Sequence, residues 1–158
     1  MPKKFTDEEY HKMLPKKQVG SAVLFFNTVG ELLILKPNYK EGWLVPGGST
    51  DEGESPLECA IRETKEEIGL DISEMQLVGV YHSPKKGFYF DSLKFIFFGG
   101  ILIAEQISQI KLQIEELDEY TFKSPNEAIP MLSPGLQNSI PKCMQAIKNK
   151  TFAYIDEK

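Results

Sequence analysis

The chain has 158 residues, 41% of them hydrophobic and 26% charged, which is the composition of an ordinary globular protein rather than a disordered or fibrous one. This length fits a single domain, residues 1–158. A net charge of −5 argues against binding to a nucleic-acid backbone, and any polyanionic ligand would need a cation bound with it. Two cysteines and no long apolar run exclude a disulfide framework and a membrane span, so we expect a cytoplasmic protein without membrane or nucleic-acid partners.

The N-terminal third predicts one short helix followed by strands. A Thr-x-x-Glu capping pattern opens a helix at 6–14, which we expect on the outside of the protein. Two β-rich runs, 19–27 and 32–35, flank turn residues and predict a hairpin. A third short strand is expected at 43–45, where a proline and two glycines stop it before a loop at 49–54.

The second half of the chain predicts further strands and two helices. Strands are expected at 75–81, 88–104 and 116–122. Pro125 and Glu127 open a short helix that Pro134 is predicted to end, and a last amphipathic helix covers about 138–150.

One helix has stronger signals than any other element. Ser55 is its N-cap, Pro56 takes the first helical position, Glu58 completes a capping box and Gly69 ends it. Its apolar stripe, predicted to face the sheet, contains Leu57, Ile61, Thr64 and Ile68.

Three glutamates of this helix, Glu63, Glu66 and Glu67, follow the spacing i, i+3, i+4 and therefore share one face. Like charges at this spacing repel each other, and Lys65 is poorly placed to neutralise all three. The simplest interpretation is a solvated acidic face. The alternative is a hard divalent cation, which would turn this repulsion into ligation and would carry positive charge to an anionic substrate.

Glu54, just before the helix, and Arg62, on it, can form an ion pair that holds the loop against the helix. The alternative is a surface ion pair that contributes little to stability.

The run GGSTDEGESPLECAIRETKEEIGL resembles the Nudix box, the signature of the Nudix hydrolase family, in its MutT-like form. The matching residues are Gly48, Glu54, Arg62, Glu63, Glu66, Glu67, Gly69 and Leu70. Thr64 stands where the box has an apolar residue, and its methyl group can still pack. The resemblance covers residues 48–70 and implies an α+β fold, the Nudix α/β/α sandwich with a mixed β-sheet between helices.

The resemblance also implies roles for individual residues. Glu63, Glu66 and Glu67, with the backbone carbonyl of Gly48 or its neighbour Gly47, would bind Mg²⁺, with Mn²⁺ as the alternative metal. Glu54 and Arg62 would support the loop and helix. The general base would be Glu63, Glu67 or a glutamate of a late loop, where the candidates are Glu115, Glu116 and Glu119, and Glu116 is our choice.

Further residues are candidates for substrate contacts. Tyr39, Trp43 and Tyr89 offer rings for stacking on a base, and Lys36 could meet a phosphate. Aromatic residues in strands more often belong to the core, which is the alternative for these rings. The expected partner is a nucleotide-type small molecule, and the expected assembly, if any, is a homodimer.

The implied function is a Mg²⁺-dependent hydrolase that cleaves the diphosphate linkage of a nucleoside diphosphate joined to another moiety. A MutT-like nucleoside triphosphate pyrophosphohydrolase is our first hypothesis. The alternatives are hydrolysis of ADP-ribose, a nucleotide sugar or a dinucleoside polyphosphate, or a non-catalytic nucleotide-binding regulator. The intact trio of Glu63, Glu66 and Glu67 argues against the regulator.

Overall fold

The computed structural model describes residues 4–157, in which seven strands form one mixed sheet. The strands are β1 (Gln18–Asn27), β2 (Leu32–Pro37), β3 (Gly47–Ser49), β4 (Gln76–Ser83), β5 (Ser92–Leu102), β6 (Leu117–Lys123) and β7 (Ala153–Asp156). Their order is β6-β2-β1-β5-β4-β7, and β3 pairs with β1 beside this path. The central strand β1 runs parallel to β5, while on its other edge it pairs antiparallel with β3 along its first half and with β2 at its end.

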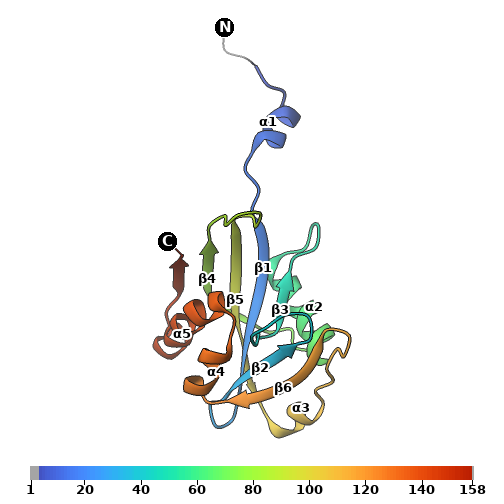
Figure 1. Ribbon diagram of the computed structural model, residues 1–158, viewed down its shortest axis with the longest axis vertical. Helices are drawn as coiled ribbons and strands as arrows, with labels where there is room; N and C mark the ends of the chain where they lie inside the picture. The colour runs from blue at the N-terminus through green and yellow to red at the C-terminus, as the bar shows by residue number, and fades with distance from the viewer. Residues whose placement is uncertain (1–3, 158) are drawn as a thin grey trace.

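Helices cover both faces of the sheet, so the predicted α/β/α sandwich is confirmed (Figure 1). The helices are α1 (Asp7–Met13), α2 (Pro56–Ile68), α3 (Ala104–Ser108), α4 (Pro125–Met131) and α5 (Pro134–Asn149). Alternate residues of β1 face opposite ways, because side chains alternate along a strand. Ala22 and Leu24 join the core under α4 and α5, and Val23 and Phe25 join the core under α2.

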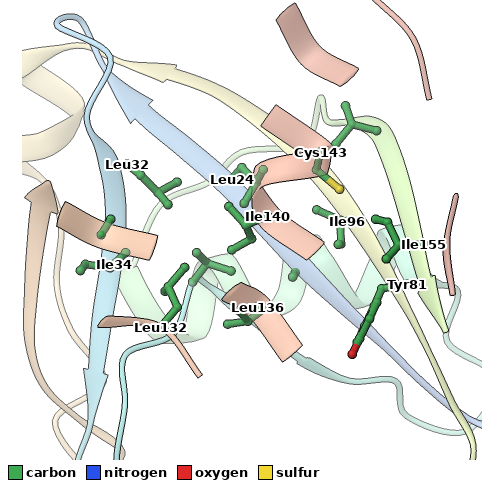
Figure 2. Packing of buried hydrophobic residues seen from close by; sticks show 14 residues of the cluster. Leu24, Leu32, Ile34, Tyr81, Ile96, Leu132, Leu136, Ile140, Cys143 and Ile155 are labelled. Atoms are coloured by element: carbon green, nitrogen blue, oxygen red, sulfur yellow. The ribbon is translucent and has the colours of Figure 1, made fainter. Parts of the chain in front are cut away.

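Figure 2 shows the first of these cores, in which Leu136, Ile140 and Cys143 of α5 pack on the sheet beside Ile96 and Tyr81. This packing holds α5 across β5 and β4, next to the strand starts that line the cavity described below. The core under α5 therefore fixes one wall of that cavity.

Helix α1 is where the capping box predicts it, with Thr6 bound to the backbone and side chain of Glu9. None of its residues is buried, and it extends from the start of β1 away from the sheet (Figure 1). Across residues 4–157, every helix is too short or too polar to cross a membrane.

The third strand lies later in the chain than predicted. Of the predicted strand only Trp43 and Leu44 form isolated bridges, and the strand is Gly47–Ser49, paired with Gly20–Ala22 of β1. The two glycines belong in the strand because there is no room for a side chain: a Cβ on Gly47 would lie 2.1 Å from the carbonyl oxygen of Ser21.

The C-terminal half contains further corrections. Pro134 does not end the preceding helix but opens α5. The backbone N–H groups of the first helical turn have no partner within the helix, so a proline, which lacks an N–H, loses no hydrogen bond there. Helix α5 therefore starts before residue 138. Strand β5 begins at Ser92 rather than 88 and stops at Leu102, where the unpredicted α3 follows. Strand β7 was also not predicted, and it pairs parallel with β4.

Candidate active site

Helix α2 is held at both ends as the sequence predicts. The Ser55 side chain accepts from the backbone N–H of Glu58, whose carboxylate accepts in turn from the Ser55 N–H. At the other end Gly69 has φ 74°, and its N–H bonds to the Lys65 carbonyl. These caps fix the register of the helix and therefore the direction of its acidic side chains.

The inner face of α2 is not the predicted apolar stripe. Its buried residues are Cys59, Ala60, Thr64, Glu67 and Ile68. The prediction was right for Thr64 and Ile68 but wrong for Leu57, which is 39% exposed, and for the half-buried Ile61. The small Cys59 and Ala60 face the sheet instead, and this rotation turns one glutamate of the acidic face inward.

That glutamate is Glu67, which is only 5% exposed. Its Oε2 accepts a 2.7 Å hydrogen bond from the backbone N–H of Gly47. Burial, with smaller effects of Glu63, Glu116 and Glu66, raises the pKa of Glu67 to about 8 despite this bond. Helix α2 thus places a buried carboxyl group at the site, with three further glutamates near it.

The second inward glutamate, Glu63, lies against Gly48. A Cβ on Gly48 would be 2.2 Å from Glu63 Oε1, so the carboxylate occupies the space that a side chain would fill. Burial is the main cause that raises the pKa of Glu63, and Glu66 and Glu116 add to it. Glu66 is more open, with a side chain 49% exposed.

Arg62 ties the preceding loop to α2. Its Nε and Nη2 donate to the two oxygens of Glu54 at 2.8 and 2.9 Å, and Nη2 also donates to the Ser49 carbonyl at 3.1 Å. The Arg62 bonds, together with a bond from the Asp51 N–H, lower the pKa of Glu54 to about 2. The same guanidinium bonds to Glu63 and Glu66 through Nη1, at 2.9 and 3.1 Å. The predicted ion pair is therefore the centre of a network that positions the acidic face.

These carboxylates open into a cavity of about 400 Å³ beside β1 and β3. Its acidic wall is formed by Tyr39, Gly47, Gly48, Glu63, Glu67 and Glu116. Glu116 precedes β6, and its carbonyl accepts a 2.9 Å bond from the Asn38 N–H, which joins the two loops at the cavity mouth. Burial raises the pKa of Tyr39, and the charges of Glu116, Glu67 and Glu63 contribute to the same shift.

Several predicted site residues thus come together, whereas others lie elsewhere. Trp43 packs against the core under α4 and α5. This is the core role that was the alternative to base stacking for the aromatic residues. Lys36 is exposed on β2 opposite Glu119 of β6, and Tyr89 is 64% exposed in the loop between β4 and β5. None of these residues lines the cavity.

The structure adds Lys94 of β5, which lines the same cavity and which the sequence analysis missed. The available signal was a single charged residue next to the apolar run 95–98.

The donor set suits a hard divalent cation. It consists of the carboxylates of Glu63, Glu66 and Glu67 with the nearby carbonyl of Gly48, all of them oxygen donors. Burial is the main cause that raises the pKa values of Glu63 and Glu67, and neighbouring glutamates add to it; a bound cation would favour the charged carboxylates. Over residues 4–157 no three acidic, histidine or cysteine side chains converge closely enough to hold a metal as they stand. As they stand, Glu67 accepts from the Gly47 N–H, and Glu63 and Glu66 accept from Arg62.

Comparison with known proteins gives a consistent result. A family model described as NUDIX domain matches residues 16–143. A Bacillus subtilis protein named as a candidate 8-oxo-dGTP diphosphatase is 37% identical over 82 residues, which are 52% of this chain and 52% of that protein. The chain thus spans about half the length of this curated relative.

Solved structures share the fold. The MutT protein of Methanosarcina mazei Go1 aligns with a TM-score of 0.70 and 22% identity over 86% of this chain and 99% of its own. The NUDIX domain of Shewanella oneidensis NrtR, solved with ADP ribose, also aligns with a TM-score of 0.70, at 15% identity over 93% of this chain and 100% of its own. At these identities the similarity concerns the fold alone.

Proposed function

Because the chain belongs to the NUDIX domain family, we propose that it is a Mg²⁺-dependent hydrolase that cleaves the diphosphate linkage of a nucleoside diphosphate joined to another moiety. Nucleoside triphosphates are the substrate class that we place first, in line with the name of the Bacillus subtilis relative. The observation that carries the proposal is the buried, electrostatically crowded pair Glu63 and Glu67 at the wall of a nucleotide-sized cavity.

Glu63, Glu66 and Glu67, with the Gly48 carbonyl, would hold the cation. When bound, it supplies positive charge opposite the pyrophosphate and makes water easier to deprotonate. Mn²⁺ has the same preference for carboxylate and carbonyl oxygens and is the alternative metal. Arg62 and Glu54 touch neither substrate nor metal in this proposal, and they position the loop and the acidic face.

In the reaction the oxygen of water bonds to one phosphorus, and the bond from that phosphorus to the bridging oxygen breaks. Glu116 accepts the proton, because it lines the cavity and is close enough to Glu63 and Glu67 to shift the pKa of both. Its neighbours Glu115 and Glu119 are not part of the cavity wall. The Tyr39 ring, 60% exposed at the same wall, offers a stacking surface for the substrate.

The experiment is a panel of nucleoside triphosphates, ADP-ribose, nucleotide sugars and dinucleoside polyphosphates, incubated with Mg²⁺, with Mn²⁺ and with EDTA. We expect metal-dependent cleavage of triphosphates above the other classes. Faster cleavage of another class would replace our substrate class but keep the hydrolase. Ligand binding without cleavage of any member would refute the hydrolase in favour of a regulator.

Matched variants test the assignment of the base. Glu116→Gln should lower kcat strongly, whereas Glu115→Gln should leave it unchanged, because Glu115 is outside the cavity wall. Equal effects of the two substitutions would refute the role of Glu116. A homodimer and a cytoplasmic location stay predictions from the sequence.

A further inference from the structure

Residues 4–14, hereafter the arm, contain α1 and leave the body of the protein at the start of β1 (Figure 1). Every residue of the arm is exposed. Three of its large apolar side chains, Tyr10, Met13 and Leu14, follow the spacing i, i+3, i+4, which places side chains on one face of a helix. A helix of seven residues is too short to be stable in water without packing. The apolar face of the arm therefore needs a surface to pack on.

An apolar groove of about 660 Å³ lies at the opposite end of β1, where the chain turns into β2 (Figure 1). This distal groove lies between α5 and the end of the sheet, and its apolar wall contains Phe26, Phe98, Ile101, Pro141, Met144 and Ile147. The ring centroids of Phe26 and Phe98 are 6.2 Å apart. The distal groove shares no residue with the active-site cavity. An apolar surface that stays open on a folded chain is typical of an interaction site.

The arm is too short to reach the distal groove of its own chain. From Gln18 to Asn27, β1 spans about 30 Å at about 3.3 Å per residue. Met13 is five residues before Gln18, each spanning at most about 3.6 Å, and the helix adds about 1.5 Å per residue back to Tyr10. Tyr10 therefore stays within about 22 Å of Gln18. An arm that occupies the groove must belong to another molecule.

A second copy of the chain fits, because the arm and the distal groove lie at opposite ends of β1. Two copies whose β1 strands are antiparallel about a two-fold axis bring each arm beside the groove of the partner, so that the contact forms twice and the assembly closes. The eleven residues of the arm and the twelve that line the groove give each protomer an interface of about 20–30 residues, the size found in stable complexes.

The charges of the arm and the groove are also compatible. The first turn of α1 carries Asp7, Glu8 and Glu9. Of the residues that line the groove, Lys148 is the charged one, and it is exposed in the last turn of α5. Opposite charges at the rim of an apolar interface orient the partners more than they add affinity. The apolar residues would therefore supply most of the affinity, and the charges would direct the acidic start of α1 toward Lys148.

We infer that the chain forms a two-fold dimer in which the arm of each copy binds the distal groove of the other. Tyr10, Met13 and Leu14 are the side chains that enter the groove, as in other complexes in which an amphipathic helix lies in an apolar groove. The inference goes beyond the proposed hydrolase and does not depend on it, since the groove and the active-site cavity have no residue in common.

The test is the mass of the full chain in solution, measured by sedimentation equilibrium. We expect a dimer at about 100 μM, because interfaces of this size have dissociation constants of about 1 μM or below. Met13→Glu in the arm and Ile101→Glu in the groove should each raise the dissociation constant at least about hundredfold, since a buried charge costs tenfold or more in each of two contacts. Ile114→Glu, outside the arm and the groove, is the matched control and should leave it unchanged. Met13, Ile101 and Ile114 are 62%, 59% and 77% exposed, so all three variants should fold, which their melting temperatures check.

Mixing the two single variants distinguishes arm exchange from any other dimer. Met13→Glu keeps an intact groove and Ile101→Glu keeps an intact arm, so a mixed dimer regains one of its two contacts. We expect this mixed dimer at concentrations at which neither variant dimerises alone. A wild type that is monomeric at about 100 μM would overturn the inference. A dimer that either substitution leaves unchanged, or a mixture that shows no rescue, would overturn it as well.

Discussion

A single methyl group added at Gly48 would test whether the position of the Glu63 carboxylate controls activity. An alanine Cβ there would lie 2.2 Å from Glu63 Oε1 and 2.6 Å from its Cδ. The backbone of Gly48 is outside the left-handed region, so alanine adopts its conformation without strain. Only the end of the Glu63 side chain must therefore move.

The required movement sets the expected effect. Ordinary contact begins at 3.4 Å, so the carboxylate must retreat by about 1 Å or more. A displacement of about 1 Å at a reacting centre costs roughly 10²-fold in rate, which corresponds to about 2.7 kcal/mol of transition-state stabilisation. Stability should change little, because replacing glycine by alanine restricts the unfolded chain, a gain of about 0.4–1 kcal/mol, which offsets the disturbed Glu63–Arg62 bond.

The assay is kcat/KM for the best substrate with Mg²⁺, together with the melting temperature. Gly48→Ala should lose about 10²-fold in kcat/KM and unfold within about 1 kcal/mol of wild type. Gly30→Ala is the control, since its added Cβ meets nothing within 4 Å and its φ of +83° makes the change strained but remote. The control should lose stability by about 1 kcal/mol and keep its activity. A folded Gly48→Ala enzyme with activity within about threefold of wild type would refute the reasoning.

Three further predictions concern single side chains. Glu67→Gln should lose metal-dependent turnover. Its melting temperature should stay level or rise, because the amide oxygen can still accept the Gly47 hydrogen bond without burying a charge. Normal turnover would contradict the assignment, and a melting-temperature scan checks that the variant is folded. Thr64→Val should barely change the rate, because the Thr64 hydroxyl bonds only to the Ala60 carbonyl of its own helix, and a large loss in steady-state rate would show otherwise. Hydrogen bonds from Lys86, Tyr81 and Ser83 lower the pKa of Glu157 to about 2. Glu157 should therefore add stability that is complete above about pH 4.5 and is lost as the pH falls toward 2. A melting-temperature difference between wild type and Glu157→Gln that stays constant from about pH 7 to about pH 2.5 would exclude this.

The local signals of α2 made the site predictable from the sequence. Caps at Ser55 and Gly69 fix the ends of a helix in any fold, so the spacing of its glutamates implied a shared face before any tertiary contact was known. The Glu54–Arg62 pair was also predictable, because it joins residues close in sequence.

Features that depend on tertiary packing were not predictable in this way. The rotation of α2 follows from the small side chains of Cys59 and Ala60 meeting the sheet, whereas periodicity favoured the larger Leu57 and Ile61. Strand β3 forms at Gly47 and Gly48 because β1 approaches them closely, although a Gly-Gly pair in sequence indicates a turn. Lys94 was missed because only the pairing of β5 with Gly20 brings it to the cavity.

The cavity wall carries acidic groups from α2 and Glu116 and basic groups from Lys40 and Lys94. Burial raises the pKa of Glu67 to about 8 at one end and lowers the pKa of Lys94 at the other. The strand between them keeps these groups about two strand spacings, roughly 10 Å, apart. A nucleotide that arrives with its divalent cation brings that cation to the carboxylates, so its phosphates meet positive charge that the acidic wall lacks. Cation and nucleotide should therefore bind cooperatively, and this explains how a chain with net charge −5 can select a polyanionic substrate without a basic surface.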